Sequence, residues 1–106
     1  MLKDLNLSSN FIRNIIVLES VDFKNLENLN LSINIISDIR VLEKVKFEEL
    51  RLLDLCHNDI GDIKIFEKVN FQNLEELDLR YNELELYSDS STILLLESKL
   101  KILYYQ

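Results

Sequence analysis

The feature that most constrains this chain is an internal repeat of 24 residues. In register, four units open with leucine, at Leu2, Leu26, Leu50 and Leu74, and two more leucine columns and an asparagine column follow in each unit. A unit of this size cannot bury its apolar side alone, so a repeat this dense predicts units stacked on one another. The 106 residues are therefore predicted to form a single domain, residues 1–106, with a partial fifth unit from Leu100.

The first part of each unit is predicted to be a β-strand. Apolar and polar residues alternate there, as Leu5, Asn6 and Leu7 do, which is the period of a strand with one buried side. Stacking the units makes these strands neighbours in a parallel sheet whose inner side is a wall of leucines. The asparagine that ends each strand, such as Asn34, is predicted to hydrogen-bond the backbone of the bend.

The second part of each unit is predicted to be a short helix of one to two turns, packed on the outer side of the leucine wall. Ile39, Leu42 and Val45 are three residues apart, which is helical spacing. Asp38, and Asp62 one unit later, precede these runs as natural N-caps. A phenylalanine column is predicted to stack as an aromatic spine in the core. Its members are Phe23, Phe47 and Phe71.

The last unit departs from this pattern, because the segment after Asn82 is two residues longer and lacks the valine and phenylalanine columns. Asp89 or Ser90 is predicted to cap a longer helix that includes residues 93–99. The final residues repeat the leucine pattern, which predicts a fifth strand at about residues 102–105.

The pattern LxxLxLxxN resembles the leucine-rich repeat. Its continuation NxIxxIxxL, carried by Asn34, Ile36, Ile39 and Leu42, is similar to the intracellular class that includes the leucine-rich-repeat regulatory subunit of protein phosphatase 1. Repeats of that class are about two residues shorter than these. The resemblance implies an α/β fold, a right-handed solenoid with a parallel β-sheet on its concave side and short helices on its convex side. It also implies docking on an enzyme such as a phosphatase as one alternative function.

A protein-binding surface is predicted on the later half of the concave side. The outward strand columns vary while the core columns do not, and the third and fourth units carry aromatic residues, an arginine and carboxylates. Aromatic residues with arginine are typical of contact hot spots, and the carboxylates favour a basic or amide-rich partner. The predicted partner-binding residues are Leu52, Asp54, Cys56, His57, Glu76, Asp78, Arg80, Tyr81 and Tyr104. The chain is therefore predicted to be a protein–protein interaction module.

Composition and spacing argue against other functions. The net charge of −7 disfavours nucleic acid, and the longest apolar run, residues 93–96, is far too short for a membrane helix. Cys56 and His57 are adjacent strand residues that should point to opposite sides, and His57 with Asp54 or Asp78 lacks a recognised metal-ligand spacing. The chain is predicted to be no enzyme and to hold no metal or cofactor. Its single cysteine favours the cytoplasm.

Both ends of the array are predicted to expose core residues, because Leu2 and Leu5 begin it, and Leu103 and Tyr105 end it, without polar caps. Exposed apolar edges and unpaired strand groups favour association. A third alternative is therefore a fragment of a longer repeat protein that self-associates through its ends.

Overall fold

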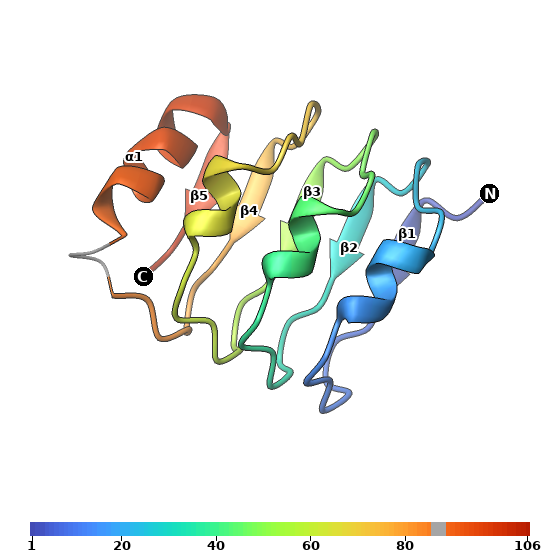
Figure 1. Cartoon of the computed structure of the whole chain (residues 1–106), viewed down its shortest axis with the longest axis horizontal. Coiled ribbons are helices and arrows are strands. Elements are labelled where there is room, and N and C mark those ends of the chain that lie inside the picture. Colours follow the sequence, from blue (N-terminus) through green and yellow to red (C-terminus); the bar gives the residue numbers. More distant parts are fainter. Residues whose placement is uncertain (86–88) are drawn as a thin grey trace.

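The computed structural model describes residues 1–85 and 89–106 and contains one five-stranded parallel sheet in chain order (Figure 1). Each strand is three residues long, and each of the first four is followed by a return segment on the far side of the core. The strands are β1 (Asp4–Asn6), β2 (Asn28–Asn30), β3 (Leu52–Asp54), β4 (Glu76–Asp78) and β5 (Ile102–Tyr104). The predicted fifth strand is confirmed, and it ends one residue earlier than expected.

The register of the sheet follows the 24-residue repeat. The central leucine of each strand pairs with the central leucine of the next, so that Leu29 lies beside Leu53 and Leu53 beside Leu77. Parallel pairing in this register puts every inward leucine on the same side of the sheet. The predicted leucine wall is therefore confirmed.

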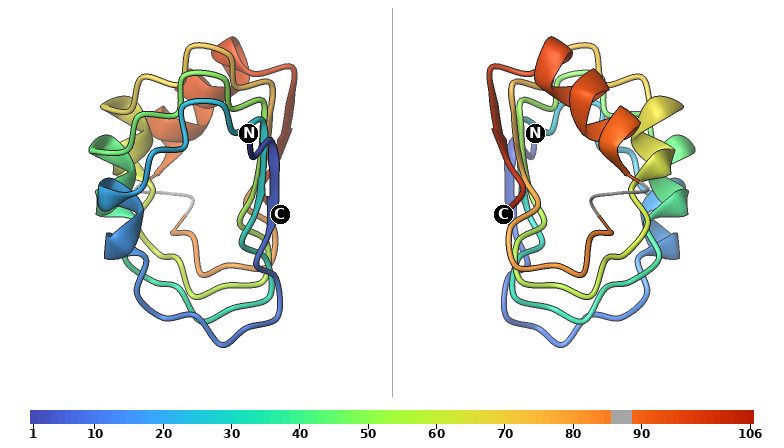
Figure 2. Two further views of the ribbon diagram at one scale, coloured as in Figure 1. Left: turned by 90° about the vertical axis from the view of Figure 1, so that its right-hand side faces the viewer. Right: turned by 90° about the vertical axis from the view of Figure 1, so that its left-hand side faces the viewer.

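The return segments contain short helices that line the side of the coil opposite the sheet (Figure 2). Three are 3₁₀ helices, η1 (Ile16–Ser20), η2 (Arg40–Glu43) and η3 (Lys64–Glu67), and the last is the α-helix α1 (Ser90–Lys99). This confirms the prediction of short helices after each strand. It also confirms the longer helix of the last unit, with Asp89, one of its two predicted caps, at the N-cap position but without a side-chain cap hydrogen bond.

The predicted N-caps of η2 and η3 need a correction. Ile39 and Ile63 occupy the cap positions, and neither makes a side-chain cap bond. Asp38 instead accepts a hydrogen bond from the backbone N–H of Arg40, at 3.0 Å, and Asp62 accepts the same bond from Lys64, at 2.9 Å. A side chain that bonds the backbone N–H two residues later forms an Asx-turn. This turn fits the start of a tight 3₁₀ helix better than an α-helical N-cap does.

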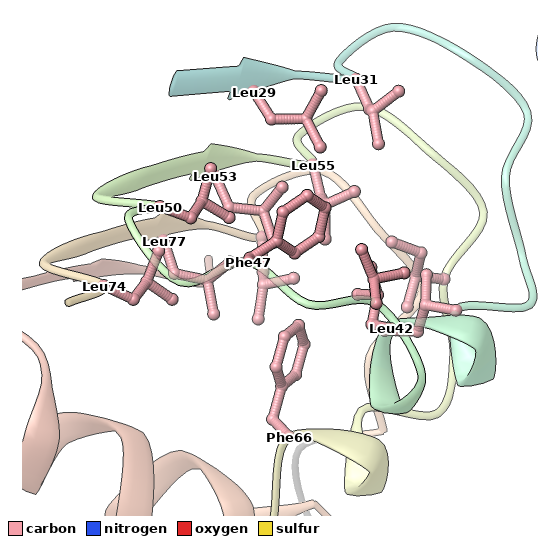
Figure 3. Close-up of a cluster of buried hydrophobic side chains, with 14 of the residues drawn as sticks. Leu29, Leu31, Leu42, Phe47, Leu50, Leu53, Leu55, Phe66, Leu74 and Leu77 are labelled. Atoms are coloured by element: carbon pink, nitrogen blue, oxygen red, sulfur yellow. The ribbon is translucent and has the colours of Figure 1, made fainter. Parts of the chain in front are cut away.

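The core fills the space between the leucine wall and the helices (Figure 3). Leu53 and Leu77 are fully buried. The predicted aromatic spine is confirmed: the ring centroids of Phe23 and Phe47 are 6.2 Å apart, and those of Phe47 and Phe71 are 5.9 Å apart. These are ordinary distances for aromatic pairs that contribute to core stability.

The asparagine column also acts as predicted, and Asn58 shows how. Its Nδ2 group donates to the carbonyl oxygens of Leu31, Leu55 and Cys56, and its Oδ1 accepts from the backbone N–H of Ile36. Asn34 and Asn82 make the equivalent bonds in their units. Each of these side chains therefore joins its own strand end to the preceding unit.

Asp89 is a buried carboxylate at the start of α1. It stands at the N-cap of α1 and is only 2% exposed. Among the described residues its Oδ2 has no hydrogen-bond partner. Burial, followed by the nearby charge of Asp62, raises the pKa of the Asp89 carboxyl group above its ordinary value of 3.8.

Replacing this carboxylate should stabilise the protein at neutral pH. Because the folded-state pKa is raised, the folded chain holds the proton more tightly, and stability falls as pH rises from about 4 through the folded pKa. Asp89→Asn should therefore increase the free energy of unfolding at pH 7 by about 1 kcal/mol. Urea denaturation at pH 3 and pH 7 measures the effect, with the exposed Asp59→Asn as control. Equal gains at both pH values, or the same gain for the control, would contradict this account.

Candidate functional site

The sheet brings five of the predicted partner-binding residues together on its outward side, which is called the sheet face below. Leu52 pairs with Glu76, Asp54 with Asp78, and Asp78 in turn with Tyr104. These are the outward positions of β3, β4 and β5. Their grouping follows from the register alone.

Arg80 joins this group through Asp78 and Tyr104. Its Nε donates to Asp78 Oδ1 at 3.0 Å and its Nη2 to Oδ2 at 2.7 Å. The guanidinium carbon lies 4.3 Å from the centroid of the Tyr104 ring. This two-bond ion pair raises the pKa of Arg80 above its ordinary value, and it fixes both planar groups in one orientation.

The pairing changes the predicted role of Asp78. Sequence reasoning treats Asp78 as a carboxylate that faces the partner, whereas the structure shows it 7% exposed and neutralised by Arg80. The spacing Asp-x-Arg in the sequence could have indicated this ion pair. Asp38 and Arg40 have the same spacing, and they form the same two bonds on the other side of the molecule. The acidic contribution of the sheet face therefore comes from Asp54 and Glu76.

His57 and Tyr81 form a second group at the turn edge of the sheet face. Their rings stack with centroids 4.3 Å apart and planes 16° apart. Both residues have a left-handed backbone, with φ of 55° and 60°, a conformation that costs side-chain-bearing residues roughly 1 kcal/mol each. Ile33, in the same column, shares this backbone and is 54% exposed. Its column position marks it as an additional surface residue that the predicted set omits.

Cys56 lies between these two groups. Burial, followed by a hydrogen bond to the Asp54 carboxylate, raises the pKa of the Cys56 thiol to about 12. The thiol is therefore protonated at neutral pH and is a poor nucleophile. His57 stacks on Tyr81 rather than serving as its base. The two residues lie beyond the end of β3 and make separate contacts.

The same neighbourhood holds a group of possible metal donors. Among the described residues, one donor atom each of Asp54, Cys56 and Asp78 lies within 4.8 Å of the others. A cation here would compete with Arg80, which already donates to both oxygens of Asp78. These contacts favour a direct polar network over metal binding.

Comparison with known proteins supports the fold. A model of the family described as Leucine Rich Repeat matches residues 73–96, which include β4 and much of α1. No curated protein matches the chain. The five parallel strands, their short return helices and this family match together fit an α/β leucine-rich-repeat solenoid. None of the helices in residues 1–85 and 89–106 has the length and apolar character needed to cross a bilayer.

Proposed function

We propose that this chain is a non-catalytic protein-interaction module whose partner binds the later half of the sheet face. The proposal rests on one observation above all, a set of rings held in place by the fold but left open to solvent. Tyr81 is 64% exposed while stacked on His57, and Tyr104 is 39% exposed beneath Arg80. Rings already fixed in one orientation lose little conformational entropy on binding, and tyrosine and arginine are common in hot spots.

The charges of the sheet face indicate the chemistry of the partner. Among the described residues, no ion pair joins Asp54 or Glu76 to a cation of this chain. Both are half-buried, so their attraction for an incoming cation or amide is less screened than that of fully exposed carboxylates. The partner is expected to present lysine, arginine or side-chain amides beside an apolar group that packs on Tyr81.

The test removes these groups while leaving the core intact. The partner captured by the wild-type chain is titrated by calorimetry against the triple variant Asp54→Asn, Tyr81→Ser and Tyr104→Ser. Affinity should fall at least thirtyfold, roughly 2 kcal/mol, because two ring contacts and one charge are lost. Phe11→Ser is the matched control, since Phe11 is an 86% exposed ring outside the sheet. Unchanged affinity of the triple variant would place the site elsewhere.

A regulatory form of this function is docking on an enzyme such as a phosphatase. It is supported by the NxIxxIxxL pattern of Asn34, Ile36, Ile39 and Leu42. Co-purification of a catalytic subunit with the chain would support enzyme docking. A partner without catalytic activity would exclude enzyme docking for that complex. We place the interaction in the cytoplasm because Cys56 is a free thiol.

Self-association is a second candidate, supported by apolar side chains at both ends of the 106-residue chain. Leu2 is 51% exposed beside β1, while at the other end Leu94 of α1 is 67% exposed and the inward Leu103 of β5 is only half-buried. β1 and β5 each pair with one neighbour only, so each has an edge of unpaired backbone groups. Sedimentation velocity over a dilution series tests this, and a monomer at every concentration excludes it.

A further inference from the structure

The aromatic spine ends at Phe71. The last unit has no phenylalanine at the position that carries one in the three full units. In the full units a phenylalanine stands three residues before the next unit opens, as Phe47 and Phe71 do. The residue three before Leu100 is Glu97, which is exposed on α1. Among the residues that the structure describes, no fourth ring therefore follows Phe71 in the spine.

A groove of about 330 Å³ lies at this place, between η3, the segment before β4 and the last turns of α1. Its apolar lining residues are Phe66, Val69, Phe71, Leu74, Leu96 and Leu100. Phe66 points from η3 toward the leucine wall (Figure 3), and its ring centroid lies 6.4 Å from that of Phe71. An apolar cavity of about 150 Å³ holds a benzene ring, so this groove has room for one ring and part of the chain that carries it.

The polar residues of the groove narrow the choice of occupant. Lys99 is the only charged residue that lines it, and no ion pair joins Lys99 to an acid among the described residues. Asn70 and Gln72 supply exposed side-chain amides, which can both donate to and accept from a peptide backbone. An apolar floor, two amides and one cation together suit an aromatic peptide residue with an acidic neighbour.

We infer that this groove binds the aromatic side chain of a partner polypeptide in which a carboxylate stands next to the aromatic residue. The ring lies against Phe66 and Phe71, in the distance range at which aromatic pairs attract one another. The carboxylate faces Lys99. None of the residues that line the groove belongs to the sheet face, so this site is separate from that face and does not depend on the function proposed for it.

Three capped dipeptides test the ring and the charge separately in the full chain labelled with ¹⁵N. Acetyl-Asp-Phe-amide should cause saturable NMR shifts at Phe71, Leu96, Lys99 and Leu100, with a dissociation constant on the order of 1 mM because one side chain is buried. Acetyl-Asn-Phe-amide should bind about threefold more weakly, as expected for an exposed ion pair. Acetyl-Asp-Ala-amide should give no saturable shift.

The variant Lys99→Gln supplies the matched control, because Lys99 is exposed and its loss should leave the fold unchanged. In this variant the Asp-Phe and Asn-Phe peptides should bind equally, while the triple variant of the sheet face should bind like wild type. Absence of saturation with acetyl-Asp-Phe-amide would overturn the inference. So would shifts centred on Tyr81 and Tyr104, or equal shifts with the alanine peptide.

Discussion

Asn58→Ala should lower the free energy of unfolding by about 3 kcal/mol. The substitution removes three hydrogen bonds that Asn58 donates and one that it accepts, each of which contributes about 1 kcal/mol. The carbonyls of Leu31 and Leu55 keep their bonds from Asn34 and Asn82, whereas the backbone N–H of Ile36 loses its bond in a buried bend. Each buried group left unsatisfied costs about 1–3 kcal/mol. Urea denaturation followed by circular dichroism measures the change, with an unchanged slope showing that the same surface is exposed on unfolding.

The matched control is Asn10→Ala in the same column. Asn10 is exposed and its side chain bonds only the carbonyls of Leu7 and Ser8, within its own unit. Water can replace those bonds, so the expected loss is below about 1 kcal/mol. Equal losses at the two positions would contradict the role assigned to the bonds between units.

Leu53→Ala should destabilise the protein by about 3–4 kcal/mol. Leu53 lies on the central strand, is fully buried and has leucine neighbours on both sides, Leu29 and Leu77. Truncation loses the transfer free energy of the side chain and leaves a cavity that a wall of paired strands cannot readily close. The loss is measured in the same denaturation experiment.

Leu5→Ala provides the comparison at the edge of the wall. Leu5 occupies the equivalent position in β1, but it is only half-buried and has a strand on one side. The expected loss is about half that of Leu53→Ala, because less apolar surface returns to water. A larger loss at Leu5 than at Leu53 would mean that the centre of the core lies elsewhere.

The repeat predicted the fold because its columns specify burial and register at the same time. A shift of one residue in the pairing would turn Leu29 and Leu53 outward, so only one register buries every unit. The phenylalanine column predicted the spine for the same reason. The type of return helix was harder to predict, because four-residue segments such as η2 carry too few residues to separate 3₁₀ from α-helical spacing.

The sequence was enough to group the candidate site residues on one side of the sheet, but not to show how they pair with one another. Strand alternation and register were enough to group Leu52, Asp54 and Glu76 on one side of the sheet. The ion pair of Arg80 with Asp78 depends on side-chain rotamers, and the stack of His57 on Tyr81 depends on a left-handed backbone that non-glycine residues seldom adopt. Neither follows from apolar periodicity, which is why the sequence alone does not show that Asp78 is already paired with Arg80.

The central claim is that successive 24-residue units pair as parallel strands in one register. Scalar couplings across hydrogen bonds, measured by NMR on the ¹⁵N- and ¹³C-labelled chain, report donor and acceptor directly. They should connect the amide of Leu31 to the carbonyl of Asp54, and the amide of Leu55 to the carbonyl of Asp78, where the N···O distances are both 2.9 Å. Couplings in an antiparallel pattern, or between residues of a shifted register, would contradict the solenoid and the binding surfaces built on it.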